Sequence, residues 1–131
     1  MLQSFKMGEQ KDMETKARYK INKLLRKMDS SNRREGYIKI YSNNSWEHTE
    51  TMFQIAYKLK KEGFLVYSEC KFINGKRADL IVFSPSGEGT IIEILHSESK
   101  ERFNQKLNDY PIDFEIMAVS TKDFDINKFN L

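Results

Sequence analysis

Two apolar segments joined by a glycine-containing turn constrain the fold of this chain more than any other feature. Residues 78–83 (ADLIVF) and 90–95 (TIIEIL) each contain consecutive apolar residues, at 80–83 and at 91–92 and 94–95, and residues 84–89 between them are rich in turn-forming types. Consecutive apolar positions bury both faces of a strand, so helices must cover both sides of the sheet. The sequence therefore predicts an α/β domain built around this pair of strands.

The segments on either side extend this hairpin into a larger sheet. Residues 65–72 precede an Asn-Gly pair at 74–75, a strong signal for a tight hairpin turn, so they should pair antiparallel with residues 78–83. Residues 37–41 and 114–119 are predicted to form two further strands. A chain of 131 residues fits one domain with a single core.

Two helices are predicted in the amino-terminal half. Apolar residues at spacings of three and four predict an amphipathic helix over residues 9–28. A second helix begins at Asn44 and Glu47, which have the spacing of a capping box, and ends at Gly63. Trp46 falls on the apolar face of this second helix, and we expect it to lie in the core.

Two more helices are predicted in the carboxyl-terminal half. One spans about residues 99–109 and ends before Pro111, because the residue before a proline disfavours helical geometry. A short final helix begins near Asp123. The expected order of elements is α, β, α, β, β, β, α, β, α.

Positive charge is concentrated near the amino terminus. The chain has a net charge of +3, but Asp29 is the only acid between residues 16 and 34. Such a run predicts contact with nucleic acid, because neutralising phosphates releases counterions, although basic helix faces also occur where they only contact solvent. The predicted nucleic-acid-binding residues are Lys16, Arg18, Lys20, Lys23, Arg26, Lys27, Arg33 and Arg34. We expect residues 1–35 to form a basic helix and linker that precede a domain of residues 36–131.

The sequence also bears on cellular location. No apolar run approaches the roughly 18 residues that span a bilayer, and the first residues, MLQSFKMGEQKD, lack the apolar region of a secretory signal. These observations predict a cytoplasmic protein with no membrane partner. Cys70 is the only cysteine, so it forms no internal disulfide, and we expect it to be a buried strand residue.

Two carboxylates in the apolar segments are the candidates for chemistry. If the turn is centred near residues 86–87, Asp79 lies across the hairpin from Glu93 or Ile94. A buried carboxylate must be paired or bound to a cation, and two on neighbouring strands suit a divalent ion such as Mg²⁺. The alternative for Asp79 is an ion pair with a base such as Arg77.

These residues occur in an order that resembles a known superfamily. A helix bearing Glu47, a hairpin bearing Asp79 and a Glu93-Ile94-Leu95 strand followed by a helix resemble the PD-(D/E)XK nucleases over about residues 36–120. The chain is most similar to archaeal Holliday-junction-resolvase-like and viral nuclease-like members. The resemblance implies a restriction-endonuclease-like core with a central mixed sheet flanked by helices. It also implies Mg²⁺- or Mn²⁺-dependent hydrolysis of phosphodiesters, DNA as the partner, and a homodimer.

The resemblance further implies a role for each matching residue. Asp79, Glu93 and the main-chain carbonyl of Ile94 correspond to metal ligands. Glu47 corresponds to a residue that supports the metal or positions the site, although its place in the capping box also explains its presence.

The sequence departs from the family pattern at one catalytic position. The family has a lysine two residues after the glutamate, where this chain has Leu95, which can neither orient water nor stabilise charge. The nearest substitute bases along the chain are Lys71, Lys76 and Lys100. Strand alternation is expected to point His96 away from Glu93 and to return Ser97 to its side. The chain is therefore either a nuclease with a relocated base or a binding module for nucleic acid or protein that has lost cleavage.

Overall fold

A computed structural model describes residues 7–96 and 100–131. Within these ranges it contains three α-helices, a short 3₁₀-helix and four strands in the order α, 3₁₀, α, β, β, β, α, β. They are α1 (Met7–Leu25), η1 (Ser30–Asn32), α2 (Trp46–Lys61), β1 (Leu65–Lys71), β2 (Arg77–Phe83), β3 (Gly89–Leu95), α3 (Lys100–Leu107) and β4 (Glu115–Ser120).

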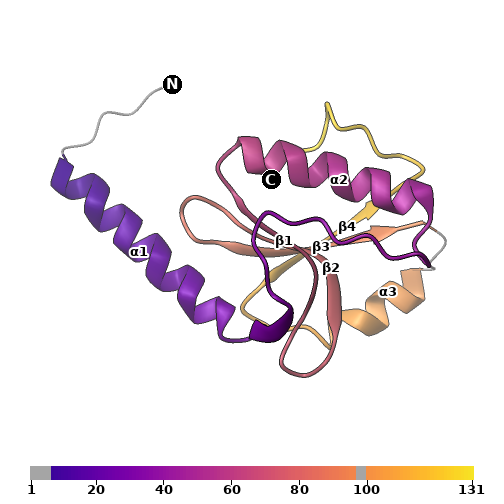
Figure 1. The fold of residues 1–131 in the computed structure, drawn as a ribbon, viewed down its shortest axis with the longest axis horizontal. Helices are drawn as coiled ribbons and strands as arrows, with labels where there is room; N and C mark the ends of the chain where they lie inside the picture. The colour runs from indigo at the N-terminus through magenta and orange to yellow at the C-terminus, as the bar shows by residue number, and fades with distance from the viewer. Residues whose placement is uncertain (1–6, 97–99) are drawn as a thin grey trace.

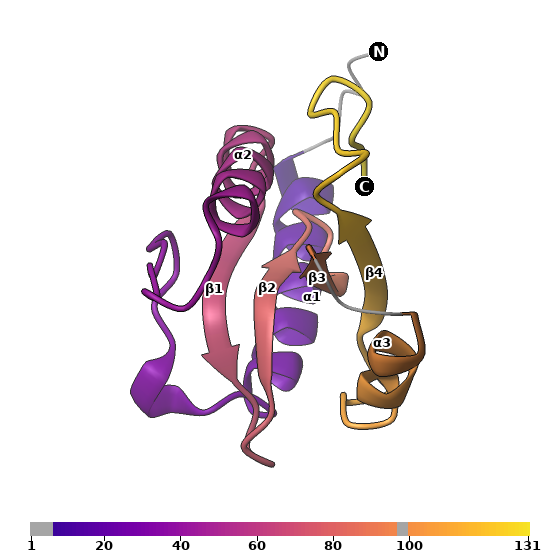
Figure 2. The same ribbon diagram turned by 90° about the vertical axis from the view of Figure 1, so that its right-hand side faces the viewer.

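The four strands form one mixed sheet in the order β1-β2-β3-β4 (Figure 2). Strands β1, β2 and β3 are antiparallel to their neighbours, whereas β4 is parallel to β3. A parallel connection needs a crossover, which the segment containing α3 provides. The prediction of an α/β protein with a mixed sheet is confirmed.

Each face of the sheet is covered, as the apolar strands predicted. Helix α2 and the carboxyl-terminal segment pack on one face (Figure 1). The buried residues there are Met52, Ile55, Ala56, Leu59, Val66, Leu80, Val82, Ile92, Ile94 and Phe129. The other face packs against the end of α1 and the segment before β4. Its buried residues are Leu24, Met28, Tyr67, Cys70, Phe72, Ala78, Ile81, Phe83, Ile91, Tyr110 and Phe114.

Helix α1 contacts the sheet through the β2–β3 turn. Gly87 has a φ of +98°, and a Cβ atom there would lie 2.8 Å from the carbonyl oxygen of Ala17. The amino-terminal half of α1 extends beyond the sheet (Figure 1), and Met13 on that half is 51% exposed. The turn therefore requires glycine for two separate reasons, its left-handed backbone and the close approach of α1.

Replacing this glycine tests the contact with α1. We expect Gly87→Ala to lower the free energy of unfolding by roughly 3 kcal/mol, because it adds backbone strain and a steric clash. Gly75→Ala is the matched control, since Gly75 has a φ of +86° but no atom within 4 Å of the added Cβ. Urea denaturation should give a loss of only about 1 kcal/mol for the control. Equal losses in the two variants would show that the close approach of Ala17 adds no steric cost to a side chain at residue 87.

Residues 37–41 do not form the predicted strand. They run beside β1, but the hydroxyl of Ser68 replaces part of the main-chain pairing. This hydroxyl accepts from the amide of Lys39 at 2.8 Å and donates to the carbonyl of Tyr37 at 2.7 Å. The side chain separates the two backbones, so no regular ladder forms.

The start of α2 differs from the capping-box prediction by one residue. Ser45 is the N-cap, and its hydroxyl accepts from the amide of His48 at 3.1 Å. Asn44 instead donates to Glu69. The predicted end is confirmed, because the helix stops at Lys61 and Gly63 has a left-handed φ of +89°.

The expectation that Trp46 lies in the core is wrong. Its side chain is 72% exposed, and that of Phe53 is 55% exposed. The face of α2 that packs on the sheet is formed by Met52, Ile55 and Leu59, so Trp46 lies on the solvent side of the helix.

The end of the chain also differs from prediction. Turns replace the helix expected near Asp123, and the carboxylate of Asp125 accepts from the amide of Asn127 at 2.9 Å. This local hydrogen bond stabilises a turn in place of a helix. Phe129 nevertheless packs against the sheet. Among the described residues, no helix has the length and apolar character needed to cross a membrane.

Candidate functional site

Strands β2 and β3 separate at Asp79 and Glu93. The last regular pair is Leu80 with Ile92, and beyond it the amide of Ile94 donates to the carboxylate of Asp79 at 2.7 Å. A side chain thus takes the place of a main-chain acceptor. The opening leaves two carboxylates on neighbouring strands at the end of the ladder.

A third carboxylate joins them from β1. Glu69 occupies the position opposite Asp79 in the β1–β2 register, and its φ of +51° is left-handed. Its side chain is only 2% exposed and is contacted by the guanidinium of Arg77 at 3.1 Å and the amide of Asn44 at 3.2 Å. The unusual backbone accompanies a break in the alternation of β1, since Tyr67 and Cys70, three residues apart, pack in the same core cluster.

An imidazole approaches from α2. The Nε2 atom of His48 lies 3.2 Å from a carboxylate oxygen of Asp79, and both side chains are largely buried. One ligand atom from each of His48, Glu69 and Asp79 lies within 4.8 Å of the others. A helix and two strands therefore bring three possible metal ligands together.

These groups line a cavity of about 540 Å³, which we name the acidic cavity. Cationic side chains also line it, so its wall combines possible metal ligands with groups that attract phosphate. Its lining residues are Asn43, Asn44, Ser45, His48, Glu69, Lys71, Gly75, Arg77, Asp79, Glu93, Ile94, His96 and Lys106.

The pKa values of Asp79 and Glu69 are shifted in opposite directions. Burial raises the pKa of Asp79, but hydrogen bonds with His48, Glu93 and the amide of Ile94 outweigh it and hold the pKa below the usual range. Burial also raises the pKa of Glu69, and the charge of Asp79 raises it further, while Arg77 offsets only part of the increase. Ionised Glu69 is therefore destabilised in this position, and an additional cation would favour it.

Glu93 is held by an aromatic hydroxyl. It is 2% exposed and accepts a hydrogen bond from the hydroxyl of Tyr110, which follows α3. Tyr110 thereby fixes the direction of a carboxylate that faces the acidic cavity.

Glu47 and His96 both differ from expectation. The side chain of Glu47 is 55% exposed and lies 3.8 Å from His96, so His48 and not Glu47 contacts Asp79. His96 lines the acidic cavity, which corrects the expectation that it points away. Strand β3 ends at Leu95, so strand alternation no longer determines the direction of the next residue.

The three proposed substitute bases also differ. Lys71 lines the acidic cavity, whereas Lys76 lies 3.6 Å from Asp109 in an ion pair. Ser97 and the side chain of Lys100 lie outside the described part of the structure. Lys106 of α3 lines the cavity and was not among the predicted bases.

The eight predicted nucleic-acid-binding residues divide into two groups. Four have partners within the chain. Lys20 and Lys27 form ion pairs, with Glu88 and Asp113 respectively. Arg33 donates to the carbonyl of Leu25, and Arg34 lies over the ring of Tyr37. Lys16, Arg18, Lys23 and Arg26 are exposed on or just after α1. About half of the basic side chains predicted to bind nucleic acid therefore contact other groups of the chain instead.

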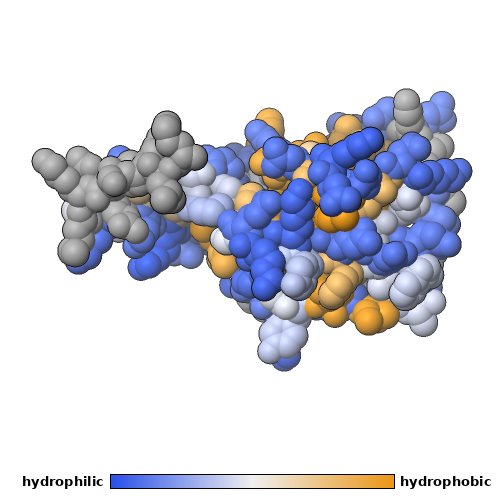
Figure 3. Space-filling view, turned by 90° about the horizontal axis from the view of Figure 1, so that it is seen from above, coloured by the Kyte–Doolittle hydropathy of each residue, from blue (hydrophilic) through white to orange (hydrophobic). Residues whose placement is uncertain are grey.

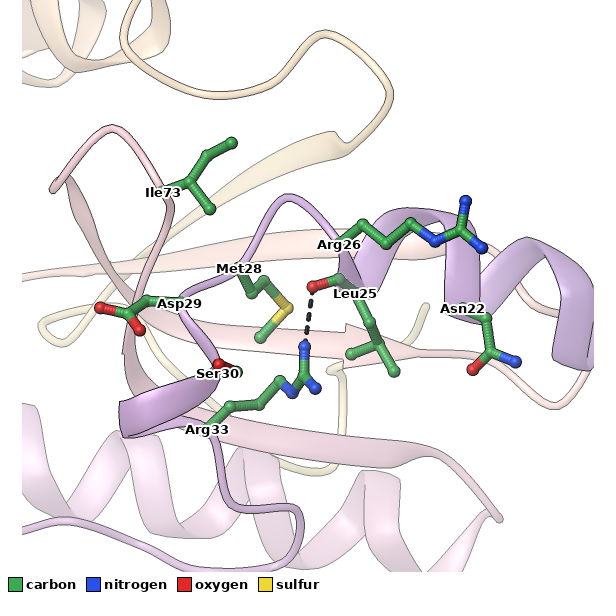
Figure 4. Close-up of a pocket in the computed structure, with 8 residues that line it drawn as sticks. All are labelled: Asn22, Leu25, Arg26, Met28, Asp29, Ser30, Arg33 and Ile73. Atoms are coloured by element: carbon green, nitrogen blue, oxygen red, sulfur yellow. Dashed lines mark hydrogen bonds between the residues drawn. The ribbon is translucent and has the colours of Figure 1, made fainter.

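A second cavity, of about 590 Å³, lies where α1 ends (Figure 4). Arg26 and Arg33 line it together with Asp29 and Ile73. The guanidinium of Arg33 points to the carbonyl of Leu25, at 2.8 Å, and so closes the last turn of α1. This cavity lacks the cluster of carboxylates and imidazole found in the acidic cavity.

Comparisons with protein-family models, with curated proteins and with solved structures find no match to this chain. Its function must therefore be inferred from the geometry of the acidic cavity.

Proposed function

We propose that this protein is a metal-dependent nuclease of the PD-(D/E)XK type that hydrolyses phosphodiester bonds in DNA. The observation that carries the proposal is the position of Asp79, which lies between Glu69 and Glu93 where two strands separate, in contact with His48. The order of elements from α2 to β4, with three antiparallel strands and a final parallel one, supports a restriction-endonuclease-like core.

The donor atoms fit a divalent ion. Ligands at about 2.1 Å from one ion lie up to roughly 4.2 Å apart, close to the 4.8 Å limit that encloses His48, Glu69 and Asp79. Carboxylates suit both Mg²⁺ and Mn²⁺, while an imidazole favours the transition metal. We therefore expect tighter binding of Mn²⁺ than of Mg²⁺.

The side chains of the acidic cavity have complementary roles in this proposal. A bound divalent ion would polarise a phosphate oxygen and lower the pKa of a coordinated water. Asp79 and Glu69 would hold the ion, and Tyr110 would keep Glu93 directed toward it. Lys71 and Lys106 would bind the phosphate and stabilise the charge that develops on it, in place of the lysine that Leu95 replaces.

The proposal is tested by incubating the protein with labelled single-stranded, duplex and four-way-junction DNA in Mn²⁺, Mg²⁺ or EDTA. We expect metal-dependent cleavage that is lost in Glu93→Gln and retained in Glu115→Gln, an exposed position at the start of β4. Absence of cleavage with every DNA, together with no Mn²⁺ binding in a calorimetric titration, would reject the nuclease proposal.

Leu95 favours a second candidate function, a nucleic-acid- or protein-binding module that has lost cleavage. Leucine at the usual lysine position removes one catalytic group, and only other cations of the cavity can replace it. Salt-dependent DNA binding with no cleavage and no Mn²⁺ binding would support this alternative. Cleavage of both strands of a duplex would in turn favour a homodimer, because each copy supplies one site, and sedimentation can detect it.

A further inference from the structure

Three aromatic side chains are exposed along the outer face of α2. Trp46, Phe53 and Tyr57 are 72%, 55% and 58% exposed, and we name them the aromatic stripe. Their spacings of seven and four residues place them on one side of the helix. The rings of Phe53 and Tyr57 stack with centroids 6.1 Å apart.

The stripe begins beside the acidic cavity. Asn43, Asn44 and Ser45, which directly precede Trp46, line that cavity, as does His48, two residues after Trp46. From there the stripe follows α2 over about 16 Å, at 1.5 Å per residue. Figure 3 views the molecule from the side on which α2 lies and shows hydrophobic patches within a mostly hydrophilic surface.

Cations lie over one ring of the stripe and over two tyrosines that precede α2. The ammonium group of Lys61 lies 5.4 Å from the ring centroid of Tyr57, and the guanidinium of Arg34 lies 5.8 Å from that of Tyr37. Near the cavity, Arg77 lies 4.6 Å from the ring centroid of Tyr41. Rings with adjacent cations suit a ligand that presents flat bases and phosphates together. The core of a protein–protein interface, by contrast, is depleted of lysine.

A pocket of about 150 Å³ adjoins the stripe. It is formed between α2, residues 36–38 and β1, and Phe53, Ala56 and Tyr57 contribute to its apolar wall. Lys60 also lines it. The ammonium group of Lys60 pairs with Glu35 at 2.7 Å, so the surface offers an apolar recess beside an ion pair.

We propose that the aromatic stripe binds single-stranded nucleic acid by base stacking and leads the strand to the acidic cavity. This inference rests on the proposed nuclease function, because that function would cleave the bound strand. It specifies a single-stranded or locally unpaired substrate. Stacking is independent of base sequence because every base has an aromatic face, so we expect little sequence preference.

The test compares two strands that differ only in their bases. A fluorescein-labelled 12-nucleotide oligothymidine and an abasic strand of the same length and charge are titrated with protein in EDTA, so that no metal-dependent cleavage occurs. We expect the wild-type protein to bind oligothymidine about tenfold more tightly than the abasic strand. Because Trp46 is the only tryptophan, its fluorescence should be quenched by oligothymidine and not by the abasic strand.

Variants separate stacking from a structural role. Trp46→Ala should lose most of the preference for oligothymidine, while Trp46→Phe should retain it because an aromatic ring remains. Tyr19→Ala is the matched control, since Tyr19 is 71% exposed on α1 away from the stripe, and it should change nothing. The salt dependence of binding should stay the same in Trp46→Ala, because no charge has been removed.

Several results would overturn the inference. These are equal binding of the two strands by the wild-type protein, binding of neither strand, or a full preference retained by Trp46→Ala. Self-association that is lost in Trp46→Ala, without strand binding, would identify the stripe as a protein interface. Absence of cleavage together with absence of Mn²⁺ binding would reject the nuclease proposal and leave the stacking inference standing, since strand binding is measured separately.

Discussion

Asp79→Asn is expected to abolish metal-dependent DNA cleavage, with a loss of at least about 100-fold in rate. The substitution removes the charge that contacts His48 and lies between two other carboxylates, while the remaining amide oxygen can still accept from Ile94. Cleavage of labelled DNA in Mn²⁺, at protein concentrations above the dissociation constant for DNA, measures the effect. DNA binding in EDTA should be unchanged or stronger, because a negative charge has left the cavity.

Asp12→Asn is the matched control for this loss. Asp12 is exposed on α1, so the same chemical change there should leave cleavage unaffected. Circular dichroism and thermal unfolding of both variants show whether the fold is retained. A folded Asp79→Asn protein that cleaves at the wild-type rate would contradict the assignment of Asp79.

Glu69→Gln is expected to stabilise the metal-free protein and to remove most of its stabilisation by Mn²⁺. Burial and the nearby charge of Asp79 destabilise ionised Glu69, and a neutral amide avoids that penalty, so the melting temperature in EDTA should rise by a few degrees. Manganese at 100 times its dissociation constant should stabilise the wild-type protein by about 2.7 kcal/mol, or roughly 10 °C. The variant, which lacks one ligand, should gain little. Thermal unfolding with and without Mn²⁺ measures both effects.

The pH dependence of this difference follows from the raised pKa of Glu69. The stability gained from protonated Glu69 is fully present below pH 4.5, the ordinary value for a glutamate, and is lost as pH rises through the higher pKa of the folded state. The advantage of Glu69→Gln in EDTA should therefore appear above pH 4.5 and grow toward neutrality. Asp79 has the opposite sign, because its lowered pKa contributes stability above its ordinary value of 3.8 that is lost as pH falls.

Glu50→Gln serves as the control, because Glu50 is exposed on α2 and its loss should not alter the response to Mn²⁺. A Glu69→Gln protein that is less stable than wild type in EDTA would indicate that the ion pair with Arg77 outweighs the burial of the carboxylate. Full Mn²⁺ stabilisation of the variant would exclude Glu69 as a ligand.

Most of the sheet could be predicted from local sequence. The apolar segments of β2 and β3 and the Asn-Gly turn before β2 fixed the antiparallel pairs, because each signal acts within a few residues. Tyr37–Tyr41 could not be assigned in this way. Its alternating pattern was correct for an extended segment, but the hydroxyl of Ser68, distant in sequence, prevented regular pairing.

The site was only partly predictable for related reasons. A two-residue turn at Asn74-Gly75 would place Cys70 opposite Asp79, whereas the observed register is shifted by one residue and places Glu69 there. The turn signal alone could therefore not identify this carboxylate. Whether His48 or Glu47 contacts Asp79 depends on the rotation of α2 about its axis. A shift of one residue in the N-cap, from Asn44 to Ser45, is enough to change which of the two faces Asp79. Neither rotation nor a long-range contact such as Tyr110 with Glu93 is encoded in local periodicity.

The backbone of Glu69 has a consequence for how the chain balances folding and function. A left-handed φ is unfavourable for a residue with a side chain, and a buried carboxylate with a raised pKa is unfavourable as well, so one position carries two local conflicts with the fold. Glycine would relieve both. Folding sequences tend to keep such frustration at functional positions, and the surrounding apolar strands must supply the stability that tolerates it. Glu69 is therefore the place where a search for more stable variants of this protein should find the largest gain and the largest functional loss together.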